Sequence, residues 1–489
     1  MVSNTRENTV KTLDKQAFQA STGNPAKINA ETRYEVCDSR MTAFGGLLAL
    51  TKFIDLVNFK EVFDRNYNSP SRKPALGCYG MMLGFLMLLF IGFARIGQLW
   101  YIREDPLVCG ILGVKILPAI STFWRYLISL GLNQSRSLLT IGAEIRSRVW
   151  QLSSLNYDSV CIDVDTTVST VYGNIEGSRK GHNTKHRGKK GLRPVFLFIE
   201  ETREYLCGTQ RRGSTITDAE MAKLVREIKR YLPSTVKRVL VKGDAEFIGG
   251  ETIKACTECG YQFIFANKRC AATFDSKQWY AWNGYQYNET IYQPLGWDTT
   301  CRFVVMRIPE EQRGERQLEL FEDNEYMHRV FATNIGAKAH TVIVTYDRRA
   351  SIEGLIKEAQ QEGILAIPSR RFLSNHAFFQ IVMLAYNIWR WMKLIAGRQI
   401  VEAKSDCHDP DRENAELFET PIVNHTIRIA RLKMLFIAAK IATHNRQTTV
   451  KYSEHDSRVC GLIDFMEYLD KKRRDMKPWA AVSLATGTY

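Results

Sequence analysis

Hydrophobic positions recur with helical spacing over most of the first 150 residues, after a polar stretch of about 30 residues. Segments 45–63 (GGLLALTKFIDLVNFKEVF) and 121–145 (STFWRYLISLGLNQSRSLLTIGAEI) carry apolar residues three and four positions apart. This pattern predicts a flexible tail over 1–30 and a helical domain over 31–154. Short helices with tight turns are compatible with a DNA-binding helix-turn-helix, and equally with ordinary helical packing.

The pattern changes to strands between residues 155 and 268. SVCIDVDTTVSTVYG and RPVFLFIEETREYLCGTQ predict a strand followed by a hairpin with its turn at 201–204. TDAEMAKLVREIKRYLP and GGETIKACTECG are helical, VKRVLVKG and YQFIFANK are apolar strands, and the two types alternate. This order of elements, a strand, a hairpin, a helix, a strand, a helix and a strand, predicts a mixed α/β sheet.

The following residues, 269–340, are rich in aromatic side chains among Gly, Asn and Thr, with alternating stretches such as CRFVVMRI. We interpret them as a β-rich insertion rather than a continuation of the α/β pattern. Helical spacing returns over 341–400. A basic region, which we expect to be helical, occupies 401–489 and includes HTIRIARLKMLFIAAKIATHNRQ.

Twenty residues without a charge, 75–94 (ALGCYGMMLGFLMLLFIGFA), are long enough to cross a bilayer. Four glycines dilute the hydrophobicity of this run, no other run of its kind occurs, and the remaining chain is globular in pattern. We therefore interpret it as a buried helix of a soluble domain and expect no membrane partner.

Composition adds a basic surplus, with 67 Lys and Arg against 52 Asp and Glu, a net charge of +15. Such a surplus favours a polyanionic partner, either nucleic acid or an anionic membrane surface. Eleven scattered cysteines and a polar beginning predict reduced thiols in an intracellular protein. Cys256 and Cys259 form a CxxC pair, but no second pair accompanies it, so buried free thiols are favoured over a zinc site.

Several acidic residues lie in or next to the strands of the predicted sheet. Asp163 and Asp165 lie two apart in the first strand and so project from the same face, and Asp244 follows the strand RVLVKG. Glu353 lies on the helix after VTYDRRAS. Carboxylates in such a cluster bind Mg²⁺, and two such ions activate an attacking oxygen and stabilise a leaving one. With the basic surplus, this chemistry indicates phosphodiester cleavage or transfer on nucleic acid.

The sequence motifs around these acidic residues resemble those of DDE transposases of bacterial insertion sequences, in particular the group numbered thirteen-eighty. They are DTT at Asp165, GDAEF at Asp244, and a Y-x2-R-x3-E block filled by Tyr346, Arg349 and Glu353. The glycine-rich basic connector 171–194 and AYNIW at 385–389 fit the same group. One departure is Gln360, where the signature has lysine, although Lys357 lies one helical turn from Glu353.

The resemblance implies an α/β fold with an RNase H-like catalytic core in two parts, 155–268 and 341–400. The β-rich insertion 269–340 interrupts this core, and helical N- and C-terminal regions flank it. The implied activity is metal-dependent cleavage at the ends of the element, followed by attack of the freed 3′-hydroxyl on target DNA. Asp165, Asp244 and Glu353 would be the catalytic residues and would hold Mg²⁺ or Mn²⁺ as two ions.

The implied partner is double-stranded DNA, both the terminal inverted repeats and the target, bound by a homodimer in the bacterial cytoplasm at the nucleoid. Residues expected to contact DNA are Tyr346, Arg349 and Lys357, the connector cations Lys185, Arg187, Lys189 and Lys190, and Trp297, which with Trp279 and Trp282 could stack on a terminal base. A nuclease without strand transfer and a DNA-binding regulator with an inactive core remain the alternatives. The presence of all three acids disfavours the regulator.

Overall fold

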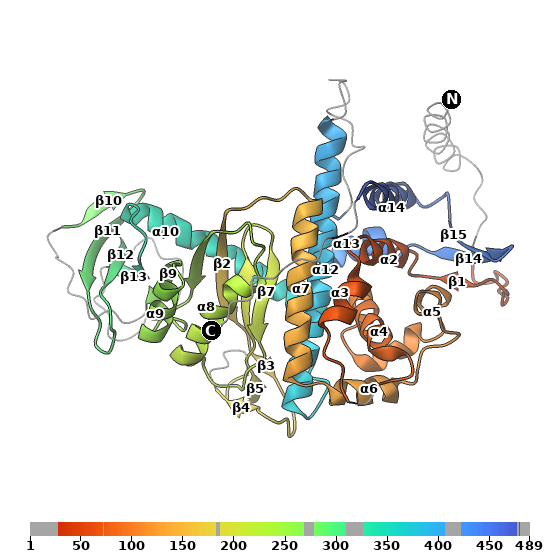
Figure 1. Ribbon diagram of the computed structural model, residues 1–489, viewed down its shortest axis with the longest axis horizontal. Helices are drawn as coiled ribbons and strands as arrows, with labels where there is room; N and C mark the ends of the chain where they lie inside the picture. The colour runs from red at the N-terminus through yellow and green to blue at the C-terminus, as the bar shows by residue number, and fades with distance from the viewer. Residues whose placement is uncertain are drawn as a thin grey trace.

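A mixed β-sheet of nine strands forms one half of the protein (Figure 1). This computed structural model describes residues 28–71, 73–181, 186–267, 278–309, 326–405, 422–476 and 479. The strand order is β10-β11-β12-β13-β9-β8-β2-β6-β7. The strands are β2 (Ser159–Thr166), β6 (Val195–Ile199), β7 (Glu204–Thr209), β8 (Arg238–Gly243), β9 (Gln262–Asn267), β10 (Tyr280–Trp282), β11 (Tyr285–Tyr292), β12 (Cys301–Pro309) and β13 (Tyr326–Thr333).

Strand β2 lies at the centre of the part of this sheet formed by β7-β6-β2-β8-β9. On one side, β2 pairs in parallel with β8, and β8 pairs in parallel with β9. On the other side, β2 pairs antiparallel with β6, and β6 forms a hairpin with β7. Helices α8 (Asp218–Tyr231) and α9 (Gly250–Glu258) make the crossover connections to β8 and β9. A capping box between Thr217 and Glu220 fixes the start of α8. The predicted alternation of strands, hairpin and helices is therefore confirmed.

Strands β10 to β13 lie in the predicted β-rich segment and extend the same sheet. Strand β13 pairs antiparallel with β9 over Val330–Thr333. An unpaired edge on β9 would expose a row of backbone donors and acceptors, and β13 satisfies them. The alternating hydrophobic residues of CRFVVMRI pack as one strand of this extension.

The two faces of the sheet have different coverings. Val160, Ile162 and Val164 of β2 pack in one core with α8, α9 and Trp150. Their neighbours Cys161, Asp163 and Asp165 face the other side because strand side chains alternate. That side is contacted by α10 (Ala339–Asp347), the short turn Arg348–Ala350, α11 (Ser351–Ala359), the π-helical turn Gln360–Ile364 and the helix that begins at Phe372.

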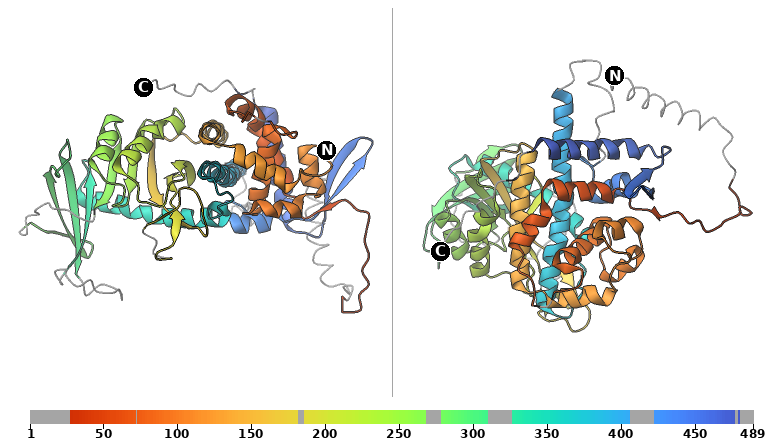
Figure 2. Two further views of the ribbon diagram at one scale, coloured as in Figure 1. Left: turned by 90° about the horizontal axis from the view of Figure 1, so that it is seen from below. Right: turned by 45° about the vertical axis from the view of Figure 1, so that its right-hand side comes forward.

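Two long helices, α7 (Leu132–Leu152) and α12 (Phe372–Ser405), lie side by side between the sheet and the other helices (Figures 1 and 2). A buried carboxylate joins them to the sheet. Glu204 of β7 accepts hydrogen bonds from Arg146 Nε (3.0 Å) and Trp150 Nε1 (2.7 Å) of α7, and from Trp391 Nε1 (2.5 Å) of α12. The helical half is thus fixed to the edge of the sheet.

The apolar run forms a buried helix in this helical half. Thirteen of the fifteen residues of α4 (Gly77–Ile91) are buried. Within the described residues no single helix is long and apolar enough to cross a membrane, although α4 and the 3₁₀ helix Ile96–Ile102 pass that test as a pair bent by 85°. The remaining helices here are α2 (Leu47–Leu56), α3 (Phe59–Asn66), α5 (Pro106–Leu112) and α6 (Ile120–Ser129).

The C-terminal region differs from the helical expectation. After α13 (Ile427–Ala430) and a π-helical turn (Arg431–Leu435), strands β14 (Ala439–His444) and β15 (Gln447–Tyr452) form a hairpin, and α14 (Arg458–Asp475) follows. Asn445 and Arg446 have φ of 48° and 63°, as the central residues of a type I′ turn require. The hairpin pairs with β1 (Met41–Thr42), so segments about 400 residues apart in sequence lie together in the helical half.

Candidate active site

Asp165 and Asp244 lie at the same end of two neighbouring parallel strands. The β2–β8 pairing ends at Val164 opposite Gly243, and the two aspartates are the next residues on each strand. Strands in a sheet are about 4.8 Å apart, so the two carboxylates begin from adjacent backbone positions. Each accepts a hydrogen bond from the next amide, Thr166 N at 2.7 Å and Ala245 N at 2.5 Å. Both strand ends therefore present a fixed carboxylate.

Glu353 approaches the pair from α11. Burial is the largest influence on Asp165 and raises the pKa of its carboxyl to about 6. The Arg349 guanidinium lowers this pKa, and the charges of Asp244 and Glu353 raise it. The structure thus brings the three predicted carboxylates within electrostatic reach of one another. Glu353 remains open to solvent, with its side chain 73% exposed.

Arg349 holds the end of β2. Its Nη2 donates to the carbonyl oxygen of Val164 at 2.8 Å and lies 3.5 Å from Asp165 Oδ2. Its side chain is only 14% exposed. We expected Arg349 to contact DNA, but the structure commits its guanidinium to the backbone and to Asp165. Its position favours orienting that carboxylate.

Tyr346 is also turned inward. Its side chain is buried against Phe331, and its hydroxyl donates to the carbonyl oxygen of Gly243 at 3.5 Å. The expected DNA contact therefore lacks the exposure that it would need. Tyr346 instead supports the strand end that precedes Asp244.

Three residues near the carboxylates had not been singled out as parts of the site. Arg193 forms an ion pair with Glu246 of the GDAEF word, and its Nε lies 3.4 Å from Thr166 Oγ1. Gln360, the departure from the family signature, donates to Thr167 Oγ1 at 2.7 Å. The Arg193 contacts connect the DTT and GDAEF motifs, and the Gln360 contact connects DTT to the turn after α11. Two features of the sequence could have pointed to Arg193 and Glu246: the basic run that ends at Arg193 and the glutamate within the GDAEF motif.

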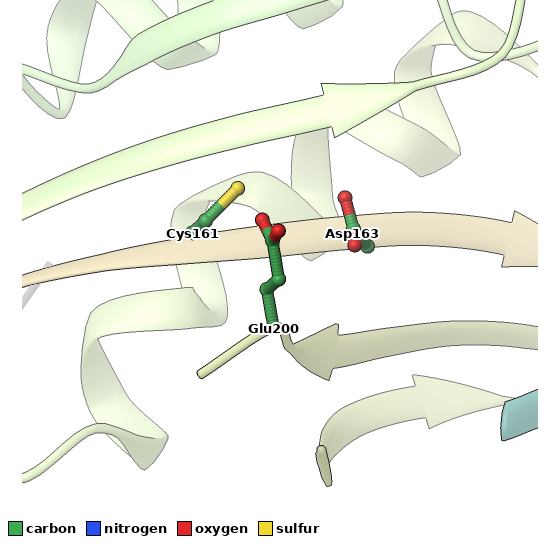
Figure 3. A group of neighbouring side chains, drawn as sticks. All are labelled: Cys161, Asp163 and Glu200. Carbon is green, nitrogen blue, oxygen red and sulfur yellow. The ribbon is translucent and has the colours of Figure 1, made fainter. Parts of the chain in front are cut away.

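Asp163 belongs to a separate, buried cluster (Figure 3). Cys161, Asp163 and Glu200 are the one group of three ligand-type side chains whose atoms lie within 4.8 Å of each other among the described residues. The ammonium of Lys242 lies between the acids, 3.4 Å from Asp163 Oδ1 and 2.7 Å from Glu200 Oε2. It also donates to Thr345 O at 3.3 Å. A protein cation therefore balances this cluster.

Burial raises the pKa of Asp163 to about 7, against the opposing effect of Lys242. Burial also acts to lower the pKa of Lys242, but Cys161 and the two carboxylates outweigh it and raise that pKa. Lys242 therefore stays charged. Asp163 is thus paired electrostatically with Lys242 at 3.4 Å, although its Oδ1 atom makes no hydrogen bond to a described residue.

The basic connector continues directly from the site end of β2. Its residues form a small sheet of β3 (Ser169–Thr170), β5 (Lys190–Leu192) and β4 (Arg179–Lys180), in that order. Arg187, Lys189 and Lys190 are exposed, and none of them forms an ion pair with another described residue. Lys185 lies outside the described residues. Lys357 is 73% exposed and 3.9 Å from Glu353. These exposed cations are available to DNA phosphates.

Trp297 lies on the other face of the sheet. It is half-buried against Phe303, with ring centroids 6.2 Å apart, in the core that contains Val164. Trp279 lies under Arg307, and Trp282 stacks on His340 at 5.1 Å. The loop of Trp297 packs against the start of α9, and stacking of one of these Trp residues on a terminal base stays a prediction.

Two buried ion pairs secure α11 and the turn that follows it. Glu358 pairs with Arg390 of α12 and accepts from the Ile427 amide at 2.6 Å. Glu362 pairs with Arg431, whose Nε donates to Phe90 O of α4 at 2.7 Å. The helix that carries Glu353 is thereby tied to α12, α4 and the C-terminal region.

The donor set suits a hard divalent cation. Asp165, Asp244 and Glu353 supply carboxylate oxygens, which Mg²⁺ and Mn²⁺ prefer. Burial raises the pKa of Asp165 most, and the charges of Asp244 and Glu353 add to it; a bound cation would offset both effects. In the Asp163 cluster, by contrast, Lys242 already supplies the positive charge.

The chain matches the family model of the transposase DDE domain, group 1, over residues 26–409. A comparison with curated proteins gave no significant match. Among solved structures, the cryo-EM structure of a piggyBac transposase synaptic complex with hairpin DNA is similar at a TM-score of 0.40 and 10% identity, covering 79% of this chain and 81% of that chain. Likeness at that level does not establish a shared fold. The family match covers most of the chain and includes all three carboxylates, so the protein belongs to the transposase DDE domain family, group 1, and is a DDE transposase.

Proposed function

We propose that this transposase cleaves DNA at the ends of a bacterial insertion sequence and joins the freed 3′-hydroxyl to target DNA. The observation that carries this proposal is the convergence of Asp165, Asp244 and Glu353 at one end of the sheet, next to exposed cations. The strand order β7-β6-β2-β8-β9 supports an RNase H-like core, with β10 to β13 as its insertion. The helical region 31–154 and the basic C-terminal region would flank this core on the DNA.

In this proposal the three carboxylates hold two Mg²⁺ or Mn²⁺ ions. Such ions activate the attacking oxygen and stabilise the leaving one. Arg349 keeps Asp165 at the strand end, while Lys357 and the exposed connector cations neutralise backbone phosphates. These residues position the scissile phosphate over the carboxylates.

The two steps differ only in the attacking oxygen. In the first, a water oxygen bonds to phosphorus, the P–O3′ bond at the element end breaks, and the leaving oxygen takes up a proton to become a 3′-hydroxyl. In the second, that hydroxyl oxygen bonds to a target phosphorus, a target P–O3′ bond breaks, and the proton passes to the new leaving oxygen. A homodimer in the nucleoid would hold both element ends.

Purified protein tested on duplex element ends and a supercoiled target examines both steps. Asp165→Asn, Asp244→Asn and Glu353→Gln should each abolish Mg²⁺-dependent cleavage and leave end binding largely intact. Pre-cleaved ends with a free 3′-hydroxyl should be joined to the target by the parent protein. Cleavage without joining would instead favour the nuclease, and full cleavage by any one variant would remove that residue from the site.

A further inference from the structure

Strands β14 and β15 form a two-stranded ribbon that projects from the helical half, at the end of the molecule away from β10 (Figures 1 and 2). Its base is fixed to the rest of the chain, because Ile441 N donates to Arg40 O at 2.8 Å and Tyr452 Oη donates to Gly45 O at 3.0 Å. One face of the ribbon packs inward, where Ala439 and Ile441 are buried. The ribbon is thus held at its base and presents its other face outward.

The outward face is polar and basic. In the register of the ribbon, Lys440 lies directly opposite Lys451, and His444 lies opposite Gln447. Directly opposed residues project from the same face of a sheet, and Thr449 joins them because it lies two positions from Lys451. All five side chains are exposed. The ribbon therefore offers solvent a polar surface with two cations side by side.

The opposed lysines are not explained by the stability of the ribbon, because like charges in that position repel. An exposed lysine often protects an edge strand from pairing with another chain, and Lys451 lies on the edge strand β15. Lys440, however, lies on the middle strand between β1 and β15, where edge protection does not apply. Neither lysine forms an ion pair with another described residue, and the nearby Asp456 pairs with Arg458. A ligand with closely spaced negative charges would offset this repulsion.

The sequence around the ribbon adds to this charge. Residues 422–453 contain six lysines and arginines and no aspartate or glutamate. Arg446, in the turn at the tip, is exposed and has a φ of 63°, a left-handed conformation that glycine adopts more readily. An arginine there does not favour the turn, but it places a further cation at the tip.

We propose that the β14–β15 ribbon lies with its outward face in the major groove of duplex DNA. This groove is about 12 Å wide and admits a two-stranded ribbon, whose strands are about 4.8 Å apart. The cations of the ribbon neutralise phosphates along the groove, and the outward polar side chains of His444, Gln447 and Thr449 face the base edges. This inference rests on the function proposed above, because it takes the element DNA as the ligand. It adds a DNA contact outside the nine-stranded sheet.

The test measures binding of the full chain to a long duplex element end across salt concentrations, without divalent metal. In Lys440→Gln/Lys451→Gln, the loss of two phosphate contacts should lower the salt slope by about two and the affinity by roughly tenfold or more. Thermal stability should equal that of the parent or exceed it, because the opposed charges are removed.

Dimethyl sulfate reports on the groove, because it methylates the N7 atom of guanine, which faces the major groove. At saturating concentrations, the parent should protect one stretch of guanines away from the cleavage site. Lys440→Gln/Lys451→Gln should leave that stretch reactive while guanines near the cleavage site stay protected. Unchanged protection in this variant would overturn the proposal.

Arg446→Gly separates charge from folding, because it removes the cation and keeps a residue that suits the turn. It should lower the salt slope by about one without loss of thermal stability. Lys471→Gln/Arg474→Gln is the matched control, since both residues are exposed on α14 and neither forms an ion pair with another described residue. Equal effects of the two double variants would show that only total charge matters, and the ribbon assignment would fail.

Two further outcomes are distinguishable from these. If Lys440→Gln/Lys451→Gln changes the sedimentation of the DNA-free protein and leaves the guanine protection intact, the ribbon is an interface between two copies and the DNA assignment fails. If the parent cleaves no element end, the proposed function fails, yet salt slopes on an unrelated duplex still report on the ribbon. If the parent cleaves and the slopes of all ribbon variants match its own, the ribbon proposal alone fails.

Discussion

Two acidic clusters lie on the same face of β2, two residues apart, and differ in what balances their charge. Asp163 and Glu200 surround the ammonium of Lys242 inside the protein. Asp165 and Asp244 lie at neighbouring strand ends, within electrostatic reach of the exposed Glu353, and among the described residues the guanidinium of Arg349 lies 3.5 Å from Asp165. Close packing of ligand-type atoms alone would have selected the first cluster as a metal site.

The comparison shows that proximity is a poor guide to a cation site unless the protein's own cations are counted. Buried carboxylates are stable when a fixed partner neutralises them. Carboxylates at a strand end that repel one another remain available for an added cation. The two aspartates of β2 therefore have different roles, which the four predictions below test.

The largest expected difference is between Asp165→Asn and Asp163→Asn. Loss of a metal ligand should slow Mg²⁺-dependent end cleavage by at least about 10³-fold. Loss of the buried charge should slow it by less than about tenfold, because Lys242 retains Glu200. Single-turnover cleavage of a labelled element end measures both rates, and equal losses would contradict the separation of the two clusters.

Removal of the balancing cation should destabilise the fold. Lys242→Met leaves Asp163 buried without its partner, at a cost of about 3–5 kcal/mol. The pKa of Asp163, about 7 in the folded parent, rises further in this variant, while the unfolded chain titrates near its ordinary value of 3.8. Folded protein then binds more protons than unfolded protein, so stability falls as the pH rises from about 4 through 7 and beyond.

Urea unfolding at pH 5 and pH 8 checks this sign. The loss of stability in Lys242→Met should be greater at pH 8. Asp163→Asn in the same chain should remove most of the added pH dependence. A loss that is the same at both pH values would show that Asp163 is not the group left without a partner.

An intermediate effect is expected for Arg349, which contacts the open cluster. Arg349→Ala frees the end of β2 and should lower the cleavage rate by about 10²-fold, the scale for loss of one preorganised group. The salt slope of end binding should not change, because the guanidinium bonds to protein. A slope reduced by one would instead make Arg349 a phosphate contact.

The smallest effect is expected for Lys357. Its ammonium is exposed and lies 3.9 Å from Glu353, so that pair contributes little to stability. Lys357→Ala should reduce the salt slope by about one and the end affinity several-fold. Filter binding across salt concentrations measures the slope, and Lys471→Ala on the exposed face of α14 is the control.

Much of the sheet could be predicted from sequence because its strands and helices have strong local patterns. VFLFI and RVLVKG are apolar runs, and Thr217 with Glu220 marks a helix start. The joining of β13 to β9 could not be predicted, because pairing between residues 63 to 69 positions apart leaves no local pattern. The β14–β15 turn also escaped notice, since Asn445 and Arg446 lack the usual glycine.

The candidate carboxylates could be identified from short sequence motifs, whereas the residues that position them depend on tertiary contacts. Arg349 and Tyr346 were expected to face DNA, yet Tyr346 is buried and Arg349 is mostly covered, and both contact the strand ends that precede the two aspartates. Basic residues in a motif indicate that positively charged side chains lie near the carboxylates. It does not distinguish a cation that binds the ligand from one that positions a carboxylate.

The contacts of residues 41–52 with residues 435–470 have a consequence for synthesis on the ribosome. Gly46 N donates to Leu435 O at 3.2 Å, β1 pairs with β14, and Lys52 contacts Asp470. Arg431 satisfies carbonyl groups at the end of α4, which emerges some 340 residues earlier. We therefore expect the N-terminal helices to stay incompletely packed until residues 427–475 have been translated. A nascent chain truncated before these residues would form no stable helical half.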